Sequence, residues 1–141
     1  MDRRAFLRSS CIGCIGVLAG AGTLSLAGCS SMPLVKVTTD RGLLRVPLSA
    51  FAEQRNVLVR VNELPYDILV SALGDGTYRS VYLRCSHRDQ PVTATPNGLY
   101  CPSHGSRFAL DGAVQEGPAT TPLHVFHTMA DGDHLIIDPK S

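Results

Sequence analysis

The chain has 141 residues, with 13 basic and 12 acidic side chains and a formal net charge of +1. This length has room for one domain with extensions, and the balanced charge does not indicate a nucleic-acid partner. Of the five cysteines, three lie within the first thirty residues, and only Cys85 and Cys101 lie beyond them. Only one pair of cysteines is therefore available to the rest of the chain.

The first 28 residues have the layout of a signal peptide. A basic start is followed by residues 11–28, which contain no charged side chain. The run RRAFLR at residues 3–8 resembles the twin-arginine consensus, which directs the export of proteins that are already folded. Cys11 and Cys14 have CxxC spacing, but they lie in an apolar leader, so we assign them no redox role.

The leader ends in LAGC at residues 26–29, which resembles a bacterial lipobox. This resemblance implies that Cys29 receives a diacylglycerol anchor and becomes the N-terminus after cleavage. The alternative is an uncleaved N-terminal membrane anchor, because eighteen uncharged residues at about 1.5 Å each would cover about 27 Å. Either reading predicts a protein of the bacterial cell envelope, held at the membrane on its periplasmic side.

The remaining sequence predicts a tether at residues 29–41 and an all-β domain at residues 42–141. Fully extended, the tether would reach about 40 Å, so the domain would work close to a membrane surface. Alternating or β-rich patterns predict strands at 43–46, 57–61, 66–70, 77–84, 92–95, 99–100, 107–110, 123–129 and 134–138. Only residues 48–54 have room for a helical turn.

Two short segments carry the residues that suit a metal centre. The first is CSH at residues 85–87, delivered by the strand at 77–84, and the second is CPSH at residues 101–104. Thirteen residues separate them. The hairpin signal Pro96-Asn97-Gly98 lies in this interval, since Asn-Gly tolerates positive φ. Each segment therefore supplies one thiol and one imidazole from a loop that adjoins a strand.

These four side chains match the needs of an iron–sulfur cluster. Such a cluster takes soft anionic thiolates, and replacing two thiolates on one iron by neutral imidazoles raises its potential. Cys85 and Cys101 could hold one iron while His87 and His104 hold the other. Zinc also accepts two Cys and two His, so a structural zinc site in an interaction protein is the alternative from the residues alone.

Three neighbours in the second loop suit the same role. Pro102 stiffens the loop, Gly105 lets the backbone approach a cluster, and the Ser106 hydroxyl can donate a hydrogen bond to a bridging sulfide. At this point CPSHGSRF at residues 101–108 resembles the CPxHG(S/W) motif of the Rieske [2Fe–2S] proteins. A weaker resemblance extends from about residue 42 to the C-terminus, and residues 117–119 resemble the family's proline-containing segment near the cluster.

The resemblance implies the fold and the activity. It implies an antiparallel β-sandwich with a small cluster-binding subdomain formed by two loops, one [2Fe–2S] cluster and transfer of single electrons. We expect redox partner proteins, such as a cytochrome or an oxidoreductase subunit. No substrate site is visible in the sequence, so an electron carrier or oxidoreductase subunit is favoured over a stand-alone enzyme. The alternative partner arrangement is similar in role to the small subunit of arsenite oxidase.

Two positions depart from the Rieske proteins of quinol-oxidising complexes. There each loop carries a further Cys and the two form a disulfide, whereas Gln90 and Ser103 occupy the matching positions here. Those proteins also have a Tyr two residues after the Ser, where its hydroxyl bonds a ligand sulfur, and this chain has Phe108. Fewer donors to sulfur lower the potential. We therefore expect a midpoint in the middle or lower half of the Rieske range of about −150 to +300 mV.

Other titratable residues are expected to have ordinary roles. Three histidines lie outside any ligand spacing: His124, His127 and His134. We expect them at the surface or in packing contacts. Three arginines lie near the ligand loops: Arg84, Arg88 and Arg107. These are either solvated charges or part of a face on which a partner protein docks.

Overall fold

The structure, a computed structural model, describes residues 31–141. The predicted leader, with Cys11 and Cys14, and the lipidation site Cys29 lie outside the described residues. The elements are β1 (Leu34–Val37), β2 (Thr39–Asp40), β3 (Leu43–Pro47), a short 3-10 helix η1 (Leu48–Phe51), β4 (Asn56–Val61), β5 (Ile68–Ala72), β6 (Tyr78–Tyr82), β7 (Thr93–Thr95), β8 (Gly98–Tyr100), β9 (Arg107–Phe108), β10 (Val114–Glu116), β11 (Val125–Asp131) and β12 (His134–Asp138). The predicted all-β class is confirmed.

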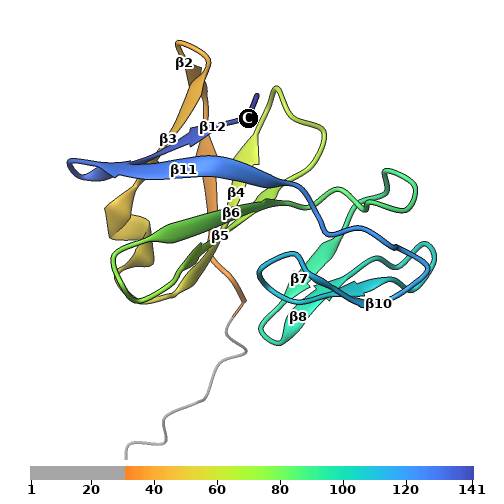
Figure 1. Cartoon of the computed structure of the whole chain (residues 1–141). Coiled ribbons are helices and arrows are strands. Elements are labelled where there is room, and N and C mark those ends of the chain that lie inside the picture. Colours follow the sequence, from red (N-terminus) through yellow and green to blue (C-terminus); the bar gives the residue numbers. More distant parts are fainter. Residues whose placement is uncertain (1–30) are drawn as a thin grey trace, which may run out of the picture. The chain divides into compact units, whose positions relative to one another are not determined.

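Eight strands form one sheet in the order β1-β4-β5-β6-β11-β12-β3-β2 (Figure 1). All pairs are antiparallel except β1 with β4, which is parallel. β1 also lies against β3, so the sheet curls around an apolar core. Val57, Val59 and Val61 point into this core and are buried, whereas Arg60 between them is exposed. The strand predicted at 57–61 is thus present, with its three valines on the inward face of β4.

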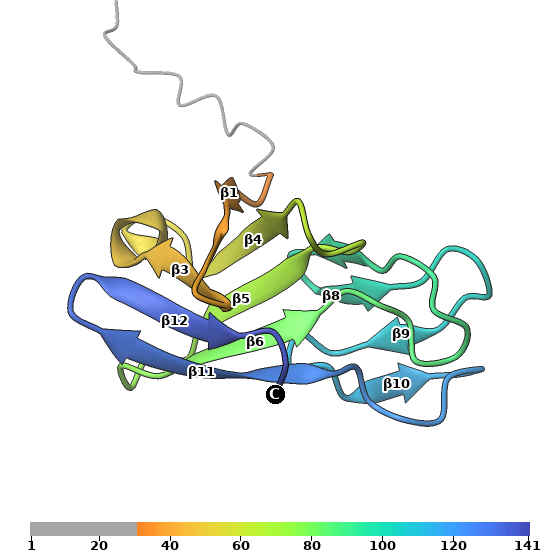
Figure 2. The same cartoon turned by 90° about the horizontal axis from the view of Figure 1, so that it is seen from above.

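β5 has buried side chains on both of its faces. The side chains of one face fill the core inside the curled sheet, and those of the other face pack against the small sheet. Ile68 and Val70 belong to the core inside the curled sheet, whereas Leu69 belongs to a second apolar cluster on the opposite face. That second cluster includes Leu99 and Phe108 of the four-stranded sheet β10-β9-β8-β7. Figure 2 shows this small sheet beyond the end of β6. The small sheet and its loops are thus held on the larger sheet by apolar packing.

The predicted hairpin between the ligand loops is present with a different turn. Thr95 pairs with Gly98, so the two loop residues are Pro96 and Asn97. Gly98 has φ +153°, and a Cβ added there would lie 3.1 Å from the carbonyl oxygen of Phe108. The glycine is therefore required by the close approach of β9, rather than by a turn with positive φ at Asn97.

The structure corrects the predicted extent of the tether. Residues 34–37 and 39–40, which the sequence analysis placed in the tether, form β1 and β2. Leu34 lies opposite Leu58 in β4, and the Leu58 N–H donates to the Pro33 carbonyl over 2.9 Å. The described chain is thus tied to the large sheet from Pro33 onward. Within residues 31–141 no helix has the length and apolar character needed to cross a membrane.

Candidate metal centre

Backbone hydrogen bonds close the first predicted ligand loop around Cys85. The Cys85 N–H donates to the Gln90 carbonyl over 2.8 Å, and the Asp89 N–H donates to the Cys85 carbonyl over 2.9 Å. Asp89 has a positive φ of +50°, and its carboxylate accepts a hydrogen bond from Arg84 Nε over 2.8 Å. This bond holds the pKa of Asp89 below its usual range. The Arg84 side chain thus stabilises the position of Asp89, at which the loop changes direction.

The second loop repeats the same backbone pattern. The Cys101 N–H donates to the Ser106 carbonyl, and the Gly105 N–H donates to the Cys101 carbonyl, both over 2.9 Å. Gly105 has φ +85°, and apart from its chain neighbours no atom of residues 31–141 lies within 4 Å of a Cβ added there. Its backbone conformation therefore accounts for the glycine at this position. The two cysteines occupy equivalent places in two similar loops.

The two thiols lie together inside the small subdomain. Cys85 and Cys101 are both fully buried and form no disulfide. Burial and the hydrogen bond with the Cys85 thiol raise the pKa of Cys101, while the backbone N–H groups of Ser103 and His104 act in the opposite direction. Those N–H groups would stabilise a thiolate that binds a metal.

The two imidazoles also lie together. The ring centroids of His87 and His104 are 4.9 Å apart, and the ring planes meet at 89°. His104 is exposed and His87 is half-buried. His87 Nδ1 is buried and has no hydrogen-bond partner within residues 31–141. A buried nitrogen without a partner is rare in a folded protein, and a metal ion would provide that partner.

The residues present therefore fit a binuclear cluster. The structure places the two thiols together and the two imidazoles together. This agrees with a cluster in which the two thiolates bind one iron and the two imidazoles bind the other. Among the described residues, no three His, Cys, Asp or Glu side chains converge on a single-ion site. Cluster binding by Cys85 with Cys101 and by His87 with His104 stays a prediction that this arrangement is compatible with.

A third segment, residues 117–121, joins both loops. The buried Ser106 Oγ accepts a hydrogen bond from the Ala119 N–H over 3.0 Å. This bond uses a lone pair and leaves the hydroxyl proton available for another acceptor. Ser86 Oγ in the first loop donates to the Thr121 carbonyl over 2.6 Å. Sequence reasoning placed the proline-containing segment near the site but missed Ser86, whose contact depends on tertiary structure.

Pro102, the remaining predicted neighbour, is exposed.

The positions that depart from quinol-oxidising Rieske proteins also lie at the site. Ser103 Oγ is 3.5 Å from Gln90 Oε1, so these two side chains face each other across the two loops. At this length the contact binds the loops only weakly. Phe108 is fully buried in the same apolar cluster as both cysteines and offers no hydrogen-bond donor.

Two of the three nearby arginines are engaged inside the domain. Arg84 pairs with Asp89, and Arg107 Nε lies 3.1 Å from a Glu116 carboxylate oxygen. Arg88 is exposed and forms no ion pair with any other described residue. Arg88 is therefore the one of the three whose charge is open to a partner protein.

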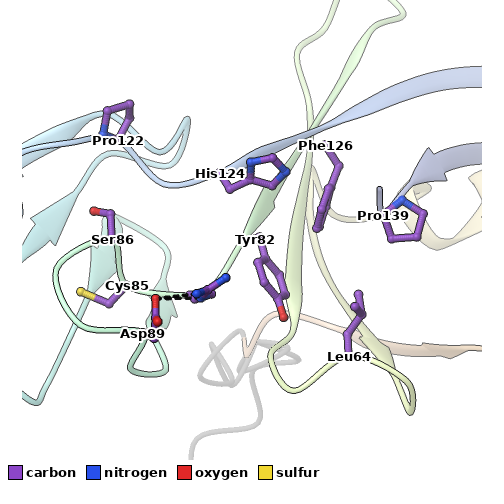
Figure 3. Close-up of a pocket in the computed structure, with 10 residues that line it drawn as sticks. Leu64, Tyr82, Cys85, Ser86, Asp89, Pro122, His124, Phe126 and Pro139 are labelled. Atoms are coloured by element: carbon purple, nitrogen blue, oxygen red, sulfur yellow. Dashed lines mark hydrogen bonds and ion pairs between the residues drawn. The ribbon is translucent and has the colours of Figure 1, made fainter. Parts of the chain in front are cut away.

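A pocket of about 370 Å³ lies behind the first loop (Figure 3). Tyr82, His124 and Phe126 give it an aromatic side, and the Arg84–Asp89 ion pair lies at its other side. The His124 ring stacks edge-on against Phe126 with centroids 4.8 Å apart. These contacts indicate that His124 has a packing role.

The other two histidines lie away from the paired rings. His127 is an exposed residue of β11, and His134 Nδ1 lies 2.5 Å from an Asp133 carboxylate oxygen. The structure therefore assigns neither residue a ligand role.

Comparisons with known proteins identify the family of this chain. Residues 46–127 match the family described as the Rieske [2Fe-2S] domain. One relative is the chloroplastic cytochrome b6-f complex iron-sulfur subunit of Bigelowiella natans, 41% identical over 49 residues that cover 35% of this chain and 19% of that protein. The cytochrome b6-f complex iron-sulfur subunit of Chlorobaculum thiosulfatiphilum is 25% identical over 139 residues, covering 96% of this chain and 75% of that protein.

A solved structure shares the fold. The cyanobacterial plasma membrane Rieske protein PetC3 from Synechocystis PCC 6803 is 22% identical, with a TM-score of 0.53 over 64% of this chain and 93% of that chain. The matched family covers more than half of the present sequence. This chain therefore belongs to the Rieske [2Fe–2S] family, an electron-transfer family whose cofactor is a [2Fe–2S] cluster.

Proposed function

We propose that this protein is a membrane-tethered extracytoplasmic electron carrier whose [2Fe–2S] cluster is bound by Cys85, His87, Cys101 and His104. The observation that carries the proposal is the pairing of two buried thiols and of two imidazole rings, one of which has a buried nitrogen without a partner. A bound cluster of this type accepts and releases one electron at a time.

The residues around the ligands support this role. The thiols are fully buried, whereas His104 is exposed, so a redox partner would approach the cluster from the histidine side. Ser106 can donate a hydrogen bond toward the cluster because its lone pair already holds the Ala119 N–H. Arg84 and Asp89 keep the first loop closed and so limit access of water to Cys85.

The location of the protein is part of the proposal. The RRAFLR run supports export of a folded protein through the twin-arginine route, which would keep a cluster that was assembled in the cytoplasm. The LAGC run supports a lipid anchor on Cys29 at the periplasmic side of the cell envelope. Intact mass tests the anchor, because a mature protein that still contains residues 1–28 would contradict lipidation.

The partner is proposed to be another redox protein, such as a cytochrome. The relatives named above are cytochrome b6-f subunits, yet Gln90, Ser103 and Phe108 here lack the disulfide and the sulfur donor expected of a quinol-oxidising subunit. This departure favours a second candidate, an electron-transfer subunit of an extracytoplasmic oxidoreductase. Co-purification with a large molybdenum or haem subunit would select that candidate, and isolation of the protein alone would favour the free carrier.

Electron paramagnetic resonance on dithionite-reduced protein tests the proposed cofactor site. Protein matured in the cytoplasm should contain two irons and two sulfides per chain and should give the rhombic signal of a His-ligated [2Fe–2S] cluster. A signal typical of all-cysteine ligation would contradict the proposed ligands. A colourless product that contains zinc would contradict the redox function.

A further inference from the structure

A second pocket, of about 330 Å³, opens at the far end of the large sheet from the ligand loops. Its polar lining consists of Arg55, Asn56, Ser71, Arg79 and Asp111. The first four come from β4, β5, β6 and the residue before β4, and Asp111 comes from the loop after β9. Nothing in the proposed electron transfer uses these residues.

Strand register places three of these side chains in one row. Asn56 is the direct partner of Ser71, and Ser71 is the direct partner of Arg79. Direct partners in neighbouring strands present their side chains on the same face of a sheet. The row continues the face on which Leu69 and Val81 pack against the small sheet. An amide, a hydroxyl and a guanidinium therefore stand side by side at the sheet end.

Ser71 is the unusual member of the row. Only 9% of the residue is exposed, and its hydroxyl is buried without a hydrogen-bond partner in the described part of the chain. Leaving a buried hydroxyl unpaired destabilises the fold, so such groups are uncommon. A ligand oxygen bound in the pocket would supply the missing partner.

The charges of the pocket favour an oxyanion. Arg55 is exposed and forms no ion pair with any residue of 31–141, and its guanidinium lies so close to Gly74 that a Cβ there would be 2.7 Å from Nη2. Arg79 Nη1 is 3.9 Å from an Asp111 carboxylate oxygen, a long contact that leaves its other donors open. Two guanidinium groups against one carboxylate give the pocket a net positive charge.

The position of the pocket indicates where the oxyanion comes from. The described chain joins the sheet at the same end, because Pro33 bonds Leu58, two residues after Asn56. Cys29 lies only four residues before Pro33 in the sequence, a reach of at most about 14 Å. Two apolar side chains at this end are exposed, Leu34 at 43% and Leu73 at 48%.

The ligand loops lie at the opposite end. Arg79 is near the start of β6, whereas Cys85 follows the end of that strand (Figure 2). Cys85 is six positions after Arg79 along an extended chain, which corresponds to about 20 Å. A surface that contacted the pocket would thus leave the two ligand loops free.

We propose that this pocket binds the headgroup phosphate of an anionic phospholipid in the membrane that carries the Cys29 anchor. The inference rests on the lipid anchor in the proposed function. Arg55 and Arg79 hold the phosphate, Asn56 and Ser71 donate hydrogen bonds to it, and Leu34 and Leu73 enter the interface beside it. The domain is then oriented with its ligand loops directed away from the membrane, toward a partner in the periplasm.

Vesicle binding of the mature chain, residues 29–141 with Cys29→Ser, tests the proposal without an attached lipid and without the apolar leader. Vesicles of phosphatidylcholine alone are compared with vesicles that also contain phosphatidylglycerol. The double variant R55Q/R79Q should bind the anionic vesicles about 30-fold more weakly, because each basic side chain at such a surface contributes about a fivefold factor. The matched control R45Q/R60Q removes the same charge outside the pocket and should retain most of the binding. Equal losses in the two double variants would overturn the proposal.

Two single variants probe the pocket itself. Ser71→Ala should weaken binding to anionic vesicles severalfold while the Tm stays the same or rises, since it removes an unpaired buried hydroxyl. Asp111→Asn should strengthen binding, because it removes the competing carboxylate. Unchanged vesicle binding in both variants would overturn the proposal.

A third arm distinguishes lipid from a free anion. Inorganic phosphate is tested for a thermal shift that depends on Arg55 and Arg79. Such a shift without preference for anionic vesicles would assign the pocket to a soluble oxyanion and overturn the membrane assignment. Cluster content is measured by electron paramagnetic resonance on every sample, so failure of the proposed redox site is read separately from failure of lipid binding.

Discussion

His87 and His104 face each other nearly at right angles, with ring centroids 4.9 Å apart. The two residues belong to different loops, and each loop is closed by the same pair of backbone hydrogen bonds around its cysteine. The rings meet because both loops are carried by the apolar cluster that contains Cys85 and Cys101. The four candidate ligands are thus held in place by the packing of the protein itself, and such preorganisation would reduce the entropy lost if they bind a cluster.

We expect His87→Ala and His104→Ala each to abolish stable cluster binding, because one iron would lose half of its protein ligands. Iron and sulfide per chain should fall far below two, and the visible absorption of the cluster should be lost. His127→Ala is the matched control, since His127 is exposed in β11 and outside the site. Normal cluster content in His104→Ala would contradict the proposed ligand set.

Phe108→Tyr should raise the midpoint potential. Phe108 is buried among the same residues as both cysteines, and a hydroxyl added to its ring could donate to a ligand sulfur. A net hydrogen bond of about 0.5–1.5 kcal/mol corresponds to about 20–60 mV for a one-electron couple. The midpoint potential of the unmodified protein should lie in the middle or lower half of the Rieske range, which is about −150 to +300 mV.

A potentiometric titration followed by electron paramagnetic resonance measures the midpoint potentials of Phe108→Tyr and of the unmodified protein. Phe51→Tyr is the control, because Phe51 packs against Tyr78 in the other core. A midpoint of Phe108→Tyr at or below that of the unmodified protein, with the cluster intact, would show that the missing hydroxyl does not set the potential.

Ser106→Ala should lower both the midpoint potential and the stability. The substitution removes a donor toward the cluster and also leaves the Ala119 N–H without its acceptor. An unsatisfied buried N–H costs about 1–3 kcal/mol, so the unfolding midpoint in urea should fall accordingly. Ser86→Ala, which removes a hydrogen bond to the exposed Thr121 carbonyl, should have a smaller effect on stability. An unchanged potential in Ser106→Ala would exclude its hydroxyl as a donor to the cluster.

The candidate site could be located from the sequence because its residue pattern is local. CSH and CPSH each keep a thiol and an imidazole within three residues, and those residue types have few other reasons to occur together. Turn residues are also informative: Gly132, between the strands predicted at 123–129 and 134–138, has φ +61°. Such signals act over a few residues and need no knowledge of which strands pair.

Features that depend on strand pairing were not predictable. The sequence pattern places residues 34–37 in the tether, because their partner, β4, begins about twenty residues later. Leu69 fits a simple alternating strand as a solvent-facing residue, yet it is buried against the small sheet. The Asn56–Ser71–Arg79 row exists only in the observed register. A shift of one residue in that register would move each side chain to the other face.

Acid should weaken the turn between β5 and β6. Asp75 accepts hydrogen bonds from the Thr77 hydroxyl over 2.5 Å and from its N–H over 2.9 Å, and these bonds lower the pKa of Asp75. A carboxylate whose pKa is lower in the folded state than in the unfolded state stabilises the fold above the unfolded value, about 3.9. This contribution is lost as the pH falls through the folded value.

Asp75→Ala should therefore be less stable than the unmodified protein at pH 7, and the difference should shrink as the pH falls below about 4. Urea unfolding at pH 7, 5 and 3 measures this trend. Asp40→Ala is the control, because Asp40 is an exposed carboxylate of the edge strand β2 and is not part of this turn. A difference between Asp75→Ala and the unmodified protein that stays constant down to pH 3 would show that the ionised carboxylate is not what holds this turn.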